Sequence, residues 1–475
     1  MHKRSTSANK FMNMLGNKNR MADEVRITIH VANILKRQEY IIKLCRSLMM
    51  FGAPTHRLEE YLRMTAKVLE TDGQFLYLPG CMIISFDDRT THTTEVKIVR
   101  SMQGVDLGRL KDIHEIYKEV LHDVVPLDDA IERLDEINKG NPKFPAWVRV
   151  IAYGFASAFV GPFAFQARPI DMPIAFFLGS LLGFLQLVVA PRSPSYSNVF
   201  EISAALLTSF LARAFGSIRG GTLFCFSALS QSSIALILPG YLVLCAALEL
   251  QSKAIVPGSI RMVYAIIYSL FLGFGITIGV TLYGAIDANA ASQTTCQNTL
   301  DPHWNFLFVP LFAFCLTIVN QAKWKQMPAM LIIALAGYVV NFFSGLKFQA
   351  APQISNMLGA LAVGLLANLY SRIRHGVAAA LMLPAIFVQV PSGLAATGSI
   401  LSGLNTANQI TKNINGTVIS GTTSVPVTTP ADLQTIVFNV AANMIQIAVG
   451  ITVGLFFAAL VIWPLGKRRS GLFTF

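Results

Sequence analysis

Two proline-containing sequences, Leu238-Pro239-Gly240 and Val390-Pro391-Ser392-Gly393, interrupt long apolar runs of the chain. A helix that is broken inside a membrane leaves N–H groups that can hold a carboxylate, and carbonyl groups that can hold an ammonium group or another cation. An amino acid carries both charges. The candidate substrate-binding residues are therefore Pro239, Gly240, Pro391, Ser392 and Gly393. The plainer interpretation is a packing kink, because Gly and Pro are common in transmembrane helices.

Two glutamines, Gln231 and Gln389, lie within about two helical turns of these breaks. A single polar side chain in an apolar run usually serves a hydrogen bond between helices. The closeness of these two to the breaks adds them to the candidate substrate-binding residues. For the other polar side chains in apolar runs, a hydrogen bond between helices remains the expected role. They are Ser232, Ser233, Asn341, Asn439, Asn443 and Gln446.

Only six acidic residues follow residue 146, and two of them, Glu201 and Glu249, fall inside or at the rim of an apolar run. An ionisable group deep in a membrane costs about 2.5–3.5 kcal/mol on insertion scales, so such groups are functional candidates. Because burial disfavours the charged form of a carboxyl group, Glu249 and then Glu201 are candidate proton-coupling residues. A solvated helix end is the alternative for each. Arg213, twelve residues after Glu201, is expected to extend to the opposite interface.

The front of the chain offers histidines and aspartates but no recognised catalytic pattern. Their spacing fits no metal site, and neither a phosphate-binding loop nor a nucleophile elbow is present. The sequence therefore predicts no enzyme, no metal and no cofactor. The residues considered are His56, His92, His114, His122, Asp87, Asp88 and Asp106.

Composition separates the chain into two parts. Of its 475 residues, 53% are hydrophobic and 13% charged, whereas soluble proteins carry about 25% charged residues. Residues 1–146 hold 22 Lys/Arg and 20 Asp/Glu, and residues 147–475 hold 16 and 6. Most of the net charge of +12 therefore lies between apolar segments, where Lys and Arg set membrane orientation, and no nucleic-acid partner is expected.

The front part is predicted to be a cytosolic α+β domain. Residues 1–30 form a flexible basic lead that lacks the apolar core of a signal peptide. Residues 31–146 combine apolar spacing typical of helices with three runs typical of strands, QFLYLP, CMIISF and HTTEVKIV. A polar turn at residues 87–90 separates the second and third runs.

From residue 147 onward, the pattern predicts an all-α polytopic membrane protein with about ten transmembrane helices, since each apolar segment approaches the 20 or so residues that span a bilayer. The segments form one set at 147–284 and another at 304–463, before a cytosolic basic tail at 464–475. They run over 147–165, 173–190, 199–215, 222–250, 260–284, 304–321, 328–345, 355–370, 376–403 and 434–463.

The two sets resemble each other. SNVFEISAALLTSFLARAFGSIRGG in the third segment is similar to SNMLGALAVGLLANLYSRIRHG in the eighth when a gap of three residues is allowed, and both breaks fall in the fourth segment of a set. Five helices per copy place the second copy upside down in the membrane, so a 5+5 inverted repeat is expected, as in many secondary transporters.

Charge also predicts orientation. With a cytosolic front domain, ten Lys/Arg fall on the cytosolic side and five on the other, namely Arg168, Arg213, Arg219, Lys347 and Lys412. Both termini are then cytosolic, and the sequon at Asn415 lies on the opposite side, where glycosylation can occur. The plasma membrane and the vacuolar membrane fit equally well. The six cysteines form no framework, and no disulfide is expected.

The strings RQEYIIKLCRSLMMFGAPTHRLEEYL, FLYLPGCMIISFDD, GVDLGRL, AIERLDEI and ALILPGYLVLCAALELQS closely resemble the threonine/serine exporter family in its fungal form, whose members are also described as pheromone-regulated membrane proteins. The resemblance is dense over residues 36–284 and looser beyond. It implies a cytosolic front domain and two five-helix units. Some members are linked to dicarboxylate export, so the resemblance leaves the substrate open.

The leading hypothesis is a secondary transporter that exports small polar metabolites, with threonine or serine as substrate, proton coupling, and a front domain that regulates or gates the cytosolic mouth. The bilayer and the small-molecule substrate are its expected partners, and a homo-oligomer is compatible with the sequence. The rivals are a dicarboxylate exporter of the same fold, a membrane-anchored hydrolase, and a non-transporting scaffold in cell fusion or signalling. Ten helices exceed what an anchor requires, and no Walker motif suggests ATP drive.

Overall fold

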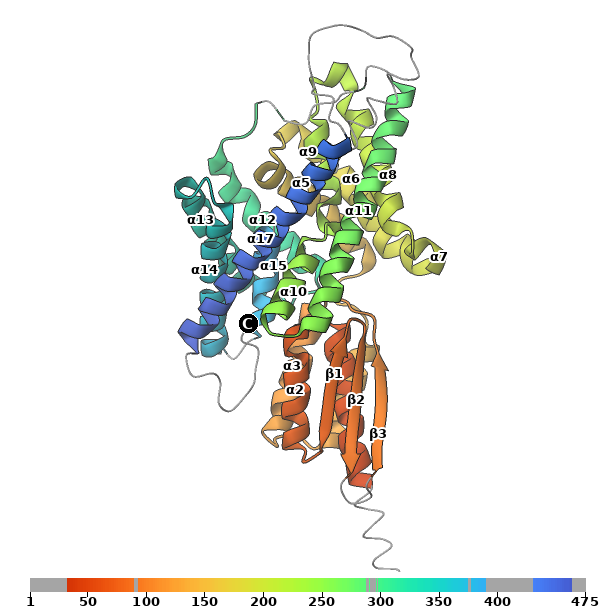
Figure 1. The fold of residues 1–475 in the computed structure, drawn as a ribbon, viewed down its shortest axis with the longest axis vertical. Coiled ribbons are helices and arrows are strands. Elements are labelled where there is room, and N and C mark those ends of the chain that lie inside the picture. The colour runs from red at the N-terminus through yellow and green to blue at the C-terminus, as the bar shows by residue number, and fades with distance from the viewer. Residues whose placement is uncertain are drawn as a thin grey trace, which may run out of the picture. The chain divides into compact units, whose positions relative to one another are not determined.

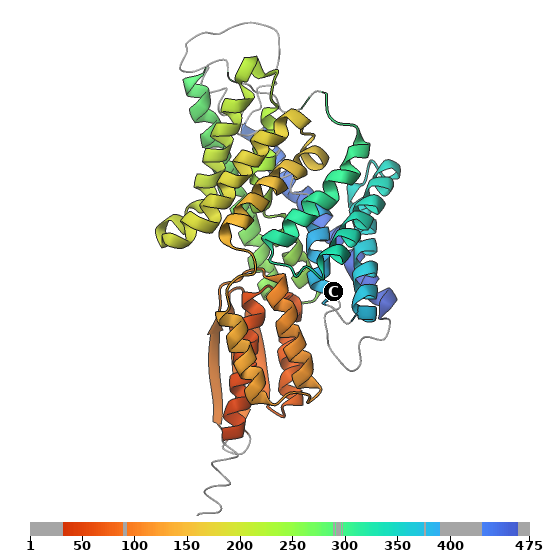
Figure 2. The ribbon, with the colours of Figure 1, turned by 180° about the vertical axis from the view of Figure 1, so that it is seen from behind.

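A computed structural model describes residues 32–88, 93–287, 290, 296, 298–374, 377–389 and 430–463 of the chain. Contacts divide it into two compact units. The first contains most of residues 1–140, and the second contains residues 141–475 together with two short segments, 54–56 and 105–111. Both are drawn in Figure 1 and, from behind, in Figure 2.

The first unit contains a small antiparallel sheet and helices. Its strands β1 (Gly73–Leu78), β2 (Cys81–Asp88) and β3 (Thr93–Arg100) pair in the order β1-β2-β3, and they coincide with the three strand-like runs of the sequence. Alternate residues of the first two strands, including Phe75, Tyr77, Met82 and Ile84, are buried, as the two-residue period of a strand requires. The helices cover residues 32–50, α2 (Thr55–Val68), α3 (Leu107–Leu121) and α4 (Leu127–Lys139).

The second unit is helical. Its longer helices are α5 (Ala146–Phe165), α6 (Met172–Phe184), α8 (Phe200–Gly216), α9 (Phe226–Ile234), α10 (Gly240–Gln251), α11 (Ile255–Ile286), α12 (Asn305–Val319), α13 (Met327–Lys347), α14 (Pro352–Arg374), α15 (Ala378–Gln389) and α17 (Pro430–Ile462). One π turn (Leu185–Val189) prolongs α6, and α7 (Pro194–Ser197) is a single turn. Short 3-10 turns lie at Pro169–Asp171, Ala190–Arg192, Ile218–Gly221, Ala235–Ile237 and Pro302–Trp304.

Seven of the described helices are long and apolar enough to cross a membrane, or eight if the bent pair α9–α10 counts as one span. The prediction of a polytopic helical membrane protein is therefore confirmed. The count of ten stays a prediction, since α8 has only 17 residues and the described part of α15 only 12.

Helices at corresponding places of the two predicted sets pack in corresponding ways. In the first set α8 packs against α11, α6 against α9 and α5 against α6, and in the second set α14 packs against α17, α13 against α15 and α12 against α13. Both α6 and α13 begin with Met-Pro, where the missing proline N–H breaks no helical hydrogen bond.

Two glycine seams make the clearest correspondence. GITIG in α11 and GITVG in α17 each place glycines four residues apart, at 275 and 279 and at 450 and 454. A Cβ on Gly275 would lie 2.6 Å from the carbonyl oxygen of Ile202 in α8, and one on Gly450 would lie 2.8 Å from that of Gln353 in α14. Only glycine permits this approach of two backbones, which is typical of membrane helix pairs.

Candidate functional site

The break between α9 and α10 is the most irregular part of the membrane-spanning helices described. After α9, a 3-10 turn leads to an extended Leu238, Pro239 follows, and α10 starts at Gly240, with a bend of 47° between the two helices. Proline cannot donate a helical hydrogen bond and forces the preceding residue out of the helix. The last carbonyl groups of α9 and the first N–H groups of α10 therefore lack helical partners at the break.

The helix before the break is polar and buried. Ser227, Ser230, Gln231, Ser232 and Ser233 are each at most 6% exposed. Gln231 Nε2 donates to Ser227 Oγ over 2.9 Å within α9, so this predicted site residue is held by its own helix. Ser230 Oγ makes no hydrogen bond in the part of the chain that the structure describes. The buried polar side chains of α9 thus lie in the helix that directly precedes the break.

The break borders a small cavity shared by both predicted sets. Leu238, Gly240 and Tyr241 line it from the break, together with Val160, Ala235, Leu236, Phe312 and Phe387. The Tyr241 and Phe387 rings stack with their centroids 5.1 Å apart. The cavity holds about 10 Å³, which is room for about one water molecule, so the site is closed in this conformation.

In the second set, Gln389 is 4% exposed at the end of α15, and neither its Oε1 nor its Nε2 has a hydrogen-bond partner among the described residues. Pro391, Ser392 and Gly393 lie outside the described residues, as does Asn415. The roles that the sequence predicts for these four residues therefore stay predictions.

The structure buries Glu249 more deeply than a solvated helix end would allow. Its side chain is fully buried in α10, and Arg261 Nε in α11 donates to Glu249 Oε2 over 3.2 Å. Arg261 is only 9% exposed. The two residues flank the short turn between α10 and α11, so the chain itself brings them together. Glu201 instead lies half-buried in the first turn of α8.

Arg213 does not extend to an interface as expected. It is 3% exposed, and its guanidinium Nη1 donates to the carbonyl oxygen of Val280 in α11 over 2.6 Å. The Arg213 side chain is therefore another tie between α8 and α11.

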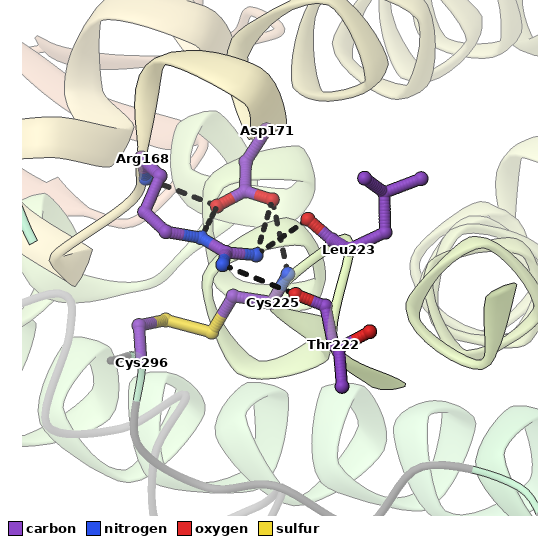
Figure 3. A network of polar contacts seen from close by, with 6 residues as sticks. All are labelled: Arg168, Asp171, Thr222, Leu223, Cys225 and Cys296. Carbon is purple, nitrogen blue, oxygen red and sulfur yellow. Dashed lines mark hydrogen bonds and ion pairs between the residues drawn. A yellow bond between two sulfur atoms is a disulfide. The ribbon is translucent and has the colours of Figure 1, made fainter. Parts of the chain in front are cut away.

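A polar network with a disulfide lies at the start of α9, and sequence reasoning missed it (Figure 3). Asp171 is fully buried, pairs with Arg168 Nε at 3.2 Å and accepts the N–H of Cys225 at 2.9 Å. Arg168 also donates to the carbonyl oxygens of Leu223, at 2.7 Å, and Thr222, at 3.4 Å. Cys225 forms a disulfide with Cys296, 71 residues later. The expectation of no disulfide was wrong, because loops far apart in sequence meet here.

Two of the candidate residues of the front part, His114 and Asp106, have defined surroundings in the structure. His114 is buried and stacks on Tyr117 with ring centroids 6.1 Å apart. Asp106 accepts the N–H of Arg109 at 2.9 Å as a cap of α3, and burial raises the pKa of its carboxyl group. Among the residues that the structure describes, no group of three His, Cys, Asp or Glu could hold a metal ion.

Two family models match consecutive parts of the chain. The model described as "Putative threonine/serine exporter" covers residues 39–283, and the model described as "Threonine/Serine exporter, ThrE" covers residues 305–461. Together they cover both predicted sets of helices. No solved structure matches the chain.

Curated fungal proteins are similar over nearly the whole chain. An uncharacterized protein of Schizosaccharomyces pombe is 56% identical over 95% of the chain. Proteins named pheromone-regulated membrane protein 10 are 50% identical over 99% of it in Candida albicans and 51% identical over 96% in Yarrowia lipolytica. The alignments cover 59%, 42% and 40% of those proteins, so the chain spans about half the length of the curated relatives it matches.

Proposed function

The chain belongs to the threonine/serine exporter family, and from this premise we propose that it is a secondary transporter that exports small polar metabolites, with threonine- and serine-type amino acids as substrates. The bilayer surrounds its helical unit. The observation that carries the proposal is the broken span α9–α10, because an anchor or a scaffold has no use for unpaired backbone groups inside a membrane.

The break offers complementary partners for a zwitterion. The first N–H groups of α10, at Gly240 and Tyr241, attract a carboxylate, and the last carbonyl groups of α9 attract an ammonium group. The adjoining cavity is too small for an amino acid, so binding requires the break to move away from α15. We propose that this closed conformation alternates with open ones during transport.

The proposed 5+5 inverted repeat is supported by the paired glycine seams of α11 and α17 and by the Met-Pro starts of α6 and α13. Inversion would place the breaks of the two sets at similar depths, so that they share one substrate site. Superposition of the halves in an experimental structure would test the inversion, which fails if they superpose only about the membrane normal.

The orientation we propose places both termini in the cytosol. It is supported by the disulfide, because disulfides persist in oxidising compartments and both cysteines lie on the side predicted to be non-cytosolic. Lys and Arg favour the same orientation. The first unit would then be cytosolic, where we propose that it regulates transport.

Proton coupling is proposed at the pair of Glu249 and Arg261. Protonation of Glu249 would remove the charge that holds Arg261, and would loosen the tie between α10, which follows the break, and α11. A buried ion pair is costly to separate unless another charge compensates, so proton uptake and movement of α10 would be linked. Glu201 is the second candidate.

Counterflow of labelled threonine, serine and succinate into proteoliposomes that contain the full chain tests the proposal. We expect saturable threonine and serine exchange, a loss of at least about tenfold in Pro239→Ala, and none in the matched control Pro328→Ala, whose proline lies in the first turn of α13. Exchange of succinate alone would favour the dicarboxylate alternative. No exchange of any solute by a folded protein would refute transport.

A further inference from the structure

The helices α13, α14 and α15 enclose a polar side chain whose amide has no hydrogen-bond partner among the residues that the structure describes. Gln389 is 4% exposed, and in the part of the chain that the structure describes its amide makes no hydrogen bond through either Oε1 or Nε2. A primary amide has two donors and an acceptor oxygen. Leaving all of them unpaired in a membrane interior is costly, so a ligand or water must supply partners in some state of the protein.

Two glycines border this amide, and the Val363 side chain packs beside it. A Cβ on Gly337 in α13 would lie 2.6 Å from Gln389 Nε2, and one on Gly359 in α14 would lie 3.0 Å from the same atom. Two glycines therefore leave the space that the amide occupies. Any larger residue at either position would push the amide aside.

Further polar groups continue from the amide along the seam between α13 and α14. Asn341, one turn after Gly337, donates through Nδ2 to Asn356 Oδ1 over 2.7 Å. Ser355 is 4% exposed, and its Oγ has no hydrogen-bond partner among the described residues. Gln389, Asn341, Asn356 and Ser355 thus lie along the seam between α13 and α14, and we call these four residues the seam site.

The chemistry of the seam site selects its ligand. An amide can donate to a carboxylate and accept from an ammonium group, and hydroxyl or amide groups can pair with a ligand hydroxyl. Between residues 327 and 346, 352 and 371, and 377 and 389 the sequence contains no Lys, Arg, Asp or Glu. A dicarboxylate would need a compensating cation, whereas a net-neutral amino acid would not.

We propose that the seam site binds a small hydroxylated amino acid such as serine, with Gln389 contacting its charged groups and the Asn341, Asn356 and Ser355 side chains its hydroxyl group. This inference rests on the proposed function and assigns part of its substrate site to the second set of helices. An amide with a purely structural role would form a hydrogen bond to a neighbouring helix, and the Gln389 amide forms none to the helices that the structure describes.

Gln389→Met tests the proposal, because methionine has a similar length and no polar amide. Gln446→Met, at an exposed glutamine of α17, is the matched control. Thermal unfolding of the purified full chain would be measured with and without serine, threonine and succinate, and serine KM would be measured in proteoliposomes. We expect Gln389→Met to unfold at the same or a higher temperature without ligand, to lose the stabilisation by serine, and to raise KM at least about tenfold.

A second variant, Gln389→Asn, keeps the amide but retracts it by one methylene group, so we expect an intermediate KM. If serine raises the unfolding temperature of the wild type and of Gln389→Met equally, the seam site is overturned and the proposed function still stands. Loss of unfolding temperature in Gln389→Met without ligand would also overturn it, in favour of a structural role. A wild-type chain that neither binds nor transports any amino acid would overturn both proposals.

Discussion

Replacing Asp171 by alanine should destabilise the membrane unit more than any exposed acidic substitution. The carboxylate is fully buried, accepts from Arg168 and also accepts the N–H of Cys225 at the start of α9. Alanine leaves a guanidinium group that is 17% exposed without its counter-charge, and a buried N–H without its acceptor.

The magnitude follows from these two losses. Removing one partner of a buried ion pair costs about 3–5 kcal/mol. The partial exposure of Arg168 and its bonds to two carbonyl oxygens favour the lower end of that range. An unpaired buried N–H adds about 1–3 kcal/mol when no water replaces the acceptor. We expect a total near 4 kcal/mol for Asp171→Ala, and about 3 kcal/mol for Asp171→Asn, which loses the charge that pairs with Arg168 but keeps one acceptor oxygen for the Cys225 N–H.

The assay is thermal unfolding of the purified protein without reductant, so that the disulfide stays intact. At about 2–4 °C for each kcal/mol in a large domain, Asp171→Ala should unfold roughly 8–16 °C below the wild type. Asp301→Ala, at an exposed aspartate, should lie within about 2 °C of it. Equal unfolding temperatures for the two alanine variants would show that the network contributes no stability, and the reasoning would fail.

Three further predictions follow. A maleimide-based mass label should modify Cys225 and Cys296 only after their disulfide is reduced, and labelling without reduction would contradict the disulfide. A membrane-impermeant reductant, applied to intact cells or to sealed secretory vesicles of known orientation, should reduce this disulfide only when it is added on the non-cytosolic side. Glu249→Gln should give a folded protein whose transport no longer responds to an imposed pH gradient, whereas full pH-driven transport would exclude Glu249 as the coupling residue. Burial raises the pKa of the Cys45 thiol to about 12, so at pH 8 only about one in ten thousand molecules carries the thiolate, and Cys45 should react far more slowly than the partly exposed Cys81; equal rates would contradict this burial.

Local sequence chemistry predicted the features that a few neighbouring residues decide. Pro239 removes a helical N–H, and the helix breaks there with a bend of 47°. The fifth apolar segment was predicted to start at residue 260, whereas α11 begins at Ile255 and contains Pro257 in its first turn. A proline in the first helical turn costs little, since the N–H groups of that turn have no partner within the helix.

Contacts between distant residues escaped prediction. Cys225 and Cys296 are 71 residues apart, and neither has a cysteine nearby that suggests a pair. A signal was present, because both lie in segments that the helix count places on the same non-cytosolic side. Glu249 was recognised as a candidate, but its ion pair with Arg261 in the next helix was not predicted.

The predicted repeat rested on the third helix of each set, whereas the clearest correspondence in the structure lies between the fifth helices, α11 and α17. GITIG and GITVG differ at one position and sit against corresponding backbones. The α8 and α14 residues that they touch, such as Ile202 and Gln353, are not the residues that the SN strings align. The repeat stays a prediction, and the alignment of the SN strings does not match the contacts of the two glycine seams.

The glycine seams also determine where the membrane unit can deform. At Gly275 and Gly450 the backbone of one helix lies close to that of its partner, which leaves little side chain between them to absorb a shift. We therefore expect α8 and α11, and likewise α14 and α17, to move as rigid pairs. The break at Leu238, by contrast, has unpaired backbone groups and a bend that can widen. We therefore expect conformational change to be concentrated in the fourth helix of each set, which would move relative to the rigid pairs α8–α11 and α14–α17.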